Sequence, residues 1–203
     1  MKKEVVKAGD KTVLLMVGSA NPSTKTQIER LCNGNKKVIR ISASAKEFAA
    51  GSDRAESEIR RVTEAVLTAI KIVPAPEAVI VETALHGEVM DLRKEDERYS
   101  YEPGTSSRMI NTGLATVTEL VLDAVGQEKI AGLMLTGGDT MESICRRIGV
   151  VCIQALDNIV AQVDVGRIIG KYDGLPVVVK GGFCGYEDVA IDIVDRIFAE
   201  NAE

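Results

Sequence analysis

The sequence is poor in the residues on which several kinds of binding site depend. Of its 203 residues, 3% are aromatic, none is tryptophan and one is histidine. Surfaces that stack nucleic-acid bases on aromatic rings are therefore disfavoured, and a metal site built from several histidines of one chain is excluded. The 25 basic and 30 acidic residues leave a net charge of −5, which argues against a broad basic face for nucleic acid.

Paired cysteines and long apolar runs are also missing. The four cysteines form no Cys-x-x-Cys pair, so we expect reduced, mostly buried thiols and no structural zinc site. The longest uncharged stretch, Thr12–Thr24, has thirteen residues, too few to span a bilayer. Gly18 to Pro22 breaks its apolar part, which favours a buried strand entering a loop over a signal peptide. The sequence predicts a cytoplasmic protein that binds neither membrane nor nucleic acid.

Apolar runs alternate with helical patterns along the chain. The expected strands are 13–17, 38–41, 78–81, 130–136, 150–153, 159–163 and 175–179. The expected helices are 23–32, 53–72, 105–125, 141–148 and 187–198. This order predicts an α/β fold of three layers, with a mostly parallel mixed sheet and helices on both faces. The late strands follow one another without helices, which indicates an antiparallel part. The polar segment 87–104 is expected to be a long exposed loop with room for a helical turn.

Three polar loops occur where an expected strand meets an expected helix, the position at which open α/β sheets bind ligands. In the first loop, Ser19, Ser23 and Thr24 supply hydroxyls next to the free amides of a helix start, which could hold phosphate oxygens. Capping of the helix by Asn21 and Ser23 explains the same residues. Spacing alone does not separate the two interpretations.

The second loop contains Gly137, Gly138, Asp139 and Thr140. Its glycines allow the backbone to approach a ligand closely, and the dipole of the following helix favours an anion. Asp139 with Glu142 three residues later has the pattern of a capping box. In the functional interpretation, Mg²⁺ lies between the Asp139 carboxylate and a bound triphosphate.

The third loop runs from Lys180 through Gly181, Gly182, Phe183 and Cys184 to Gly185. Three glycines in five residues are costly to order, so a plain turn explains them poorly. Lys180 is placed either to neutralise phosphate charge or to cover the strand end as a solvated lysine. Neither G-x-G-x-x-G nor G-x-x-x-x-G-K-[ST] occurs, so the familiar nucleotide fingerprints are missing.

Taken in order, the three loops resemble the C-terminal nucleotide-binding domain of the four-carbon acid sugar kinases. The motifs that carry the resemblance are Gly18-Ser19-x-x-Pro22-x-Thr24-x-x-Gln27, Leu135-Thr136-Gly137-Gly138-Asp139-Thr140 and Val179-Lys180-x-Gly182-Phe183-x-Gly185. The likeness extends over residues 12–197, and Asn111-Thr112-Gly113 resembles a further step in the long middle helix of the family. The ordered set is more specific than any one of its motifs.

The resemblance implies an enzyme that uses ATP and Mg²⁺ to phosphorylate a sugar acid of the threonate or erythronate type. It implies that the loops surround the nucleotide, and it identifies no catalytic residue. The association of Asp139 with Mg²⁺ follows from the carboxylate chemistry described above. Combined with the residue chemistry above, the predicted cofactor-binding residues are Ser19, Thr24, Gly137, Gly138, Asp139, Thr140, Lys180, Gly181, Gly182, Phe183 and Gly185.

Members of that family also have an N-terminal domain that binds the sugar acid, for which this sequence has no counterpart. We therefore expect residues 1–203 to be a single nucleotide-binding domain, inactive alone, whose sugar contacts and general base lie on a separate chain or a removed part. A homodimer is compatible with the sequence. The lone His86 is more typical of a packed or surface residue than of a catalyst. The alternatives are a nucleotide-binding regulatory or assembly module without catalysis, and a fold kept without any ligand.

Overall fold

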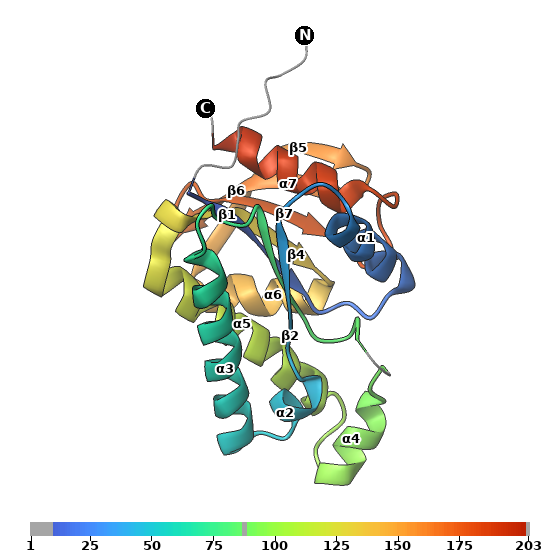
Figure 1. Cartoon of the computed structure of the whole chain (residues 1–203). Helices are drawn as coiled ribbons and strands as arrows, with labels where there is room; N and C mark the ends of the chain where they lie inside the picture. The colour runs from blue at the N-terminus through green and yellow to red at the C-terminus, as the bar shows by residue number, and fades with distance from the viewer. Residues whose placement is uncertain (1–9, 87–88, 202–203) are drawn as a thin grey trace.

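A seven-stranded sheet forms the centre of the structure, a computed structural model that describes residues 10–86 and 89–201 (Figure 1). The strands are β1 (Thr12–Val17), β2 (Val38–Ser42), β3 (Ala78–Glu82), β4 (Ile130–Thr136), β5 (Val150–Val160), β6 (Val163–Gly170) and β7 (Pro176–Lys180). The helices are α1 (Pro22–Asn33), α2 (Ala45–Ala49), α3 (Ser52–Ile70), α4 (Leu92–Tyr99), α5 (Thr105–Lys129), α6 (Gly138–Arg147) and α7 (Val189–Glu200). Within the described residues, no helix combines the length and apolar character needed to cross a membrane.

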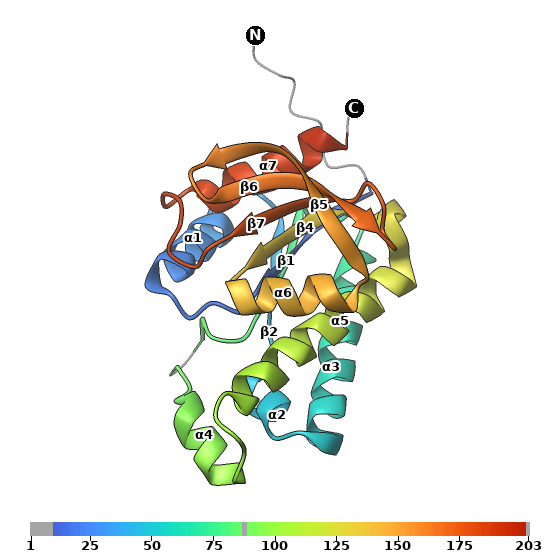
Figure 2. The ribbon, with the colours of Figure 1, turned by 180° about the vertical axis from the view of Figure 1, so that it is seen from behind.

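The strands lie in the order β2-β3-β1-β4-β7-β6-β5. The pairs from β2 to β7 are parallel, and β6 and β5 are added at one edge as antiparallel strands. Helices α1 and α7 cover one face, and α3, α5 and α6 lie on the other (Figures 1 and 2). The predicted three-layer α/β fold with a mostly parallel mixed sheet is therefore confirmed.

Burial on both faces explains why the central strands are continuous apolar runs. Every residue of β1 is buried. Leu14 and Met16 pack into the core that includes α3 and α5, whereas Val13 and Leu15 pack into the core that includes α1 and α7. Complete burial of such side chains stabilises the fold by about 2 kcal/mol each, so the two cores together hold the strand ends, and the loops that follow them, in place.

The prediction is wrong at the outer edge of the sheet. Residues 159–163 were expected to form one strand, but they contain the end of β5, a turn at 161–162 and the start of β6. β6 was not expected beyond Val163, and β5 was expected to end at Ile153. The middle of β5 is exposed and mixes polar residues with Ala155 and Leu156, so its sequence lacks the continuous apolar run of a buried strand.

Helix α2 was not predicted, and α4 is longer than the helical turn allowed in the expected loop. The segment 87–104, expected to be a long loop, contains the two-turn helix α4, while residues 87–88 lie outside the described part. Asp91 caps α4 by accepting a hydrogen bond from the Lys94 amide at 3.3 Å. The buried carboxylate of Asp96 accepts hydrogen bonds from the amides of Gly104 at 2.6 Å and Ser106 at 2.7 Å, which fixes α4 against the start of α5. Polar bonds rather than an apolar stripe hold this helix.

Candidate nucleotide-binding site

The three polar loops all lie at the carboxyl ends of the strands, on one side of the sheet. β1, β4 and β7 are neighbours and run parallel, so the loops that follow them leave from adjacent carboxyl ends. The Gly18 amide donates to the Thr136 carbonyl, and the Gly137 amide donates to the Lys180 carbonyl, both at 3.3 Å. The loops after β1 and β7 lead to helices on one face, and the loop after β4 leads to α6 on the other. A reversal of this kind marks the usual ligand crevice of an open α/β sheet.

Side chains of helix α1 hold the third loop in place through hydrogen bonds to its backbone carbonyls. The hydroxyl of Thr24 donates to the Gly182 carbonyl at 2.6 Å. The Gln27 side chain, which is 1% exposed, donates from Nε2 to the carbonyls of Cys184, Gly185 and Tyr186 at 3.0–3.1 Å. Thr24 is fully buried, so it shapes the loop rather than lining an open surface. Gln27 belongs to the first motif but was not predicted as a site residue, because its partners are more than 150 residues away along the chain.

Two glycines allow the loops to approach one another. A Cβ atom on Gly182 would lie 2.3 Å from Ser19 Oγ, and one on Gly18 would lie 2.0 Å from Thr140 Oγ1. Both distances are shorter than any van der Waals contact, so only glycine permits this arrangement. The first loop therefore lies in close contact with the second through Gly18 and Thr140, and with the third through Ser19 and Gly182.

Lys180 is a buried cation beneath the third loop. Its residue is 4% exposed, and its ammonium group donates to the Gly181 carbonyl at 2.8 Å. Burial lowers the pKa of Lys180 to about 8. The interpretation of Lys180 as a solvated lysine is therefore wrong. Within the described residues no carboxylate lies within ion-pair distance of it, so an anion bound at the loop would relieve the cost of burying its charge.

The capping interpretation holds for the first loop and fails for the second. Asn21 caps α1 by accepting a hydrogen bond from the Ser23 amide at 2.9 Å. In contrast, α6 begins at Gly138 after Gly137, and no side chain caps it. Asp139 is exposed in the first turn, and Glu142 pairs with Arg146 at 2.5 Å instead of returning to the helix start. The free amides at this helix start remain available to an anion.

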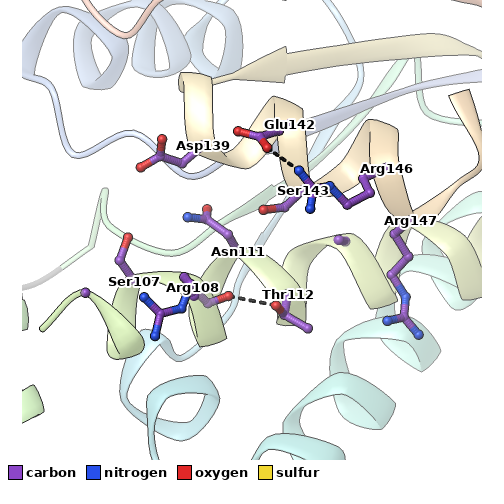
Figure 3. Close-up of a pocket in the computed structure, with 11 residues that line it drawn as sticks. Ser107, Arg108, Asn111, Thr112, Asp139, Glu142, Ser143, Arg146 and Arg147 are labelled. Atoms are coloured by element: carbon purple, nitrogen blue, oxygen red, sulfur yellow. Dashed lines mark hydrogen bonds and ion pairs between the residues drawn. The ribbon is translucent and has the colours of Figure 1, made fainter. Parts of the chain in front are cut away.

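A cleft of about 650 Å³ opens beside the second loop, between α5 and α6 (Figure 3). Its size is that of a pocket for a small organic ligand. Its lining residues include Ser107, Arg108, Asn111, Thr112, Asp139, Glu142, Ser143, Arg146 and Arg147. The Thr140 hydroxyl donates to Asn111 Oδ1 at 2.8 Å, which joins the cleft to the loop. Asn111 thus lies at the cleft, as the resemblance of its motif to the kinase family implies. On the third loop, the Phe183 side chain is exposed, with 69% of its residue accessible to solvent.

The chemistry of the loops fits a phosphate group better than a metal ion held by protein alone. The described residues contain no cluster of three or more histidine, cysteine, aspartate or glutamate side chains suited to a metal. Mg²⁺ commonly keeps several waters and binds through one or two carboxylates and the phosphates of its substrate. The exposed carboxylate of Asp139 beside a helix start matches that arrangement.

Residues 14–190 match the sequence profile of a family described as the nucleotide-binding C-terminal domain. The chain belongs to this family. A D-threonate kinase of Salmonella typhimurium is 27% identical over 185 residues, which are 89% of this chain and 41% of that protein. The resemblance to the C-terminal domain of the four-carbon acid sugar kinases is confirmed. The nucleotide-binding C-terminal domain described here spans less than half the length of that relative.

Solved structures show the same fold at low identity. One is a domain of unknown function from Bordetella bronchiseptica, a domain-swapped dimer with bound citrate. Its TM-score is 0.72 at 23% identity, covering 93% of this chain and 41% of that one. A protein of Haemophilus influenzae has a TM-score of 0.64 at 13% identity, covering 97% of this chain and 42% of that one.

Proposed function

We propose that this nucleotide-binding C-terminal domain is the ATP-binding half of a kinase that phosphorylates a four-carbon sugar acid of the threonate or erythronate type. The observation that carries the proposal is the meeting of three loops at one sheet edge, with glycine amides, the Ser19 hydroxyl and the buried Lys180 around one narrow surface. Phosphoryl transfer depends mainly on positioning and charge neutralisation, which are the properties that these groups supply. The 27% identity to a D-threonate kinase supports the choice of substrate class.

In this proposal the phosphates lie against Gly137, Gly138, Gly181, Gly182 and Gly185. Lys180 neutralises phosphate charge, and Thr24 keeps the third loop in shape. Thr140 lies where the phosphates meet the cleft, Asp139 holds Mg²⁺ through its carboxylate, and Phe183 offers an exposed ring to the nucleotide. Mg²⁺ would screen the charge of the phosphates as the terminal phosphoryl group leaves.

The sugar-acid-binding domain is proposed to be supplied by another chain or another part of the protein, because the chain spans 41% of the D-threonate kinase. Residues 1–203 would then form one nucleotide-binding domain, inactive alone. A homodimer is proposed as its assembly, supported by the domain-swapped dimer of the Bordetella relative. The use of ATP and the four free cysteines fit the cytoplasm.

Calorimetric titration with ADP and ATP, each with and without Mg²⁺, tests the proposal. We expect binding that strengthens with Mg²⁺ and raises the melting temperature, since a ligand at 100 times its Kd stabilises the native state by about 2.7 kcal/mol. Absence of binding at millimolar nucleotide would favour the alternative of a fold that is kept without a nucleotide ligand. Binding without phosphorylation of D-threonate or D-erythronate, even with a sugar-acid domain added, would favour the non-catalytic module.

A further inference from the structure

A buried carboxylate and the single histidine form a pair at the end of β3. Glu82, the last residue of the strand, is 0% exposed. Its Oε1 contacts His86 Nδ1, and its Oε2 accepts a hydrogen bond from the Leu85 amide at 2.8 Å. Arg40 on β2 approaches the same carboxylate, with its Nε 3.6 Å from Oε1. The glutamate is therefore held on both oxygens and flanked by two groups that can carry positive charge.

The pair holds His86 in one orientation and leaves part of it open to solvent. Because Nδ1 faces the carboxylate, the other ring nitrogen, Nε2, points away from it. The His86 side chain is 53% exposed, whereas Glu82 is inaccessible. A carboxylate on one imidazole nitrogen selects the tautomer and leaves the other nitrogen as a proton acceptor.

The pair lies next to the first nucleotide loop. β3 is the neighbour of β1, with Glu82 opposite Val17, and the Thr83 amide donates to the Val17 carbonyl at 3.3 Å. Adjacent strands are about 4.8 Å apart, so the loop that carries His86 starts one strand spacing from Gly18. A hollow of about 100 Å³ lies beside these loops, lined by Gly18 and Ala20 of the first loop, by Thr83 and Ala84 of the loop that carries His86, and by Ser107 and Asn111 of α5. It shares Ser107 and Asn111 with the larger cleft.

We propose that His86 is the general base of the phosphoryl transfer and that Glu82 is its positioning residue. The inference rests on the proposed function and differs from the expectation that the base lies outside this chain. As the acceptor hydroxyl oxygen bonds to the γ-phosphorus, its proton moves to His86 Nε2. The bond from that phosphorus to the bridging oxygen breaks, and ADP leaves with the electron pair. The imidazolium formed lies against the Glu82 carboxylate.

The single histidine makes the test direct, because every imidazole signal of a chain labelled with ¹⁵N-histidine belongs to His86. The first measurement is the neutral tautomer. We expect the proton on Nδ1, opposite to the preference of a free histidine side chain. In Glu82→Gln, which keeps the size of the side chain and removes its charge, the bias toward Nδ1 should fall. A proton mainly on Nε2 in the unmodified chain, or an unchanged bias in Glu82→Gln, would overturn the positioning role.

The second measurement places the imidazole relative to the nucleotide. The probe is the non-hydrolysable analogue AMP-PNP with Mn²⁺ in place of Mg²⁺, and calorimetry on the same sample shows whether it binds. A base in reach of an acceptor hydroxyl that itself contacts the γ-phosphorus should lie within about 10 Å of the metal. We expect relaxation of the His86 signals to give that distance. Binding with a clearly longer distance overturns the base role alone. Absence of binding overturns both the nucleotide proposal and the base role of His86. The tautomer measurement then still tests whether Glu82 positions the His86 ring.

Discussion

The close approach of Gly18 to Thr140 makes a quantitative prediction for Gly18→Ala. The added Cβ would lie 2.0 Å from Thr140 Oγ1 and 3.1–3.2 Å from its two carbon neighbours, Cβ and Cγ2. Thr140 is 2% exposed, so it has little room to move. If its hydroxyl turns away, the hydrogen bond to Asn111 at 2.8 Å is lost and a buried oxygen has no donor. That loss costs about 2 kcal/mol, and the crowding of carbon atoms adds about 1–2 kcal/mol.

Thr140→Ala removes the two atoms Oγ1 and Cγ2 that the new methyl group would strike. By itself it should cost about 1–2 kcal/mol through the lost bond to Asn111. In the Thr140→Ala background, Gly18→Ala should then cost only about 1 kcal/mol, because one contact near 3.1 Å, to the Thr140 Cβ, remains. The double-mutant cycle therefore predicts a coupling free energy of about 2 kcal/mol.

Urea unfolding of the four proteins measures this coupling, provided that the dependence on urea concentration stays the same in all of them. ADP titration of the same proteins tests the site, since Gly18 and Thr140 belong to two of the three loops. If the costs of the two single changes add within about 0.5 kcal/mol in the double variant, the contact between the first and second loops is not the reason for glycine at position 18.

Three further predictions concern single side chains of the site. Gln27→Leu should lower the free energy of unfolding by about 2 kcal/mol and weaken ADP binding, because three carbonyls of the third loop lose their donor. Gln127→Leu, which removes one exposed hydrogen bond, is the matched control. Equal effects of the two changes would contradict the role of Gln27 in holding the third loop. Burial lowers the pKa of Lys180 to about 8, so between about pH 8 and 10.5 the unfolded chain binds more protons and stability should rise with pH, a slope absent from Lys180→Met. ADP affinity should fall as pH rises through about 8, when the charge is lost; a flat profile would remove Lys180 from the phosphate site. Asp139→Asn should reduce the gain in ADP affinity with Mg²⁺ while Glu142→Gln leaves it intact, and an unchanged gain in Asp139→Asn would remove the metal role.

The central strands and the loops after them could be predicted from the sequence, because a strand buried on both faces is a continuous apolar run. β1, β4 and β7 all have that property, and glycines with polar residues follow each of them. β6 could not be predicted in the same way, since Asp164, Gly166 and Arg167 interrupt its apolar residues. The full length of α4 was not predicted, because Asp91 caps it and Asp96 joins it to the start of α5, contacts that produce no apolar stripe in the sequence.

Contacts between distant parts of the chain were the least predictable features of the site. The glycine spacing pointed to the loops, but nothing local indicated that Gln27 reaches the carbonyls of the third loop or that Lys180 is buried. The pairing of Glu82 with His86 spans only four residues, yet it depends on the strand end being covered. A sequence pattern reports which face of an element is buried, whereas side-chain partners depend on how the elements pack.

The antiparallel hairpin has a consequence for how this kind of site can diversify. Because β6 runs opposite to β7, it starts where β7 ends, with Val163 opposite Lys180. The turn at 161–162 therefore lies at the same edge as the third loop, and the Cys184 thiol donates to Gln162 Oε1 at 2.9 Å. The middle of β5, which leads into this turn, is exposed. In the proposed function this turn borders the loop that holds phosphate, so insertions or deletions here would change the surroundings of the ligand without moving a helix.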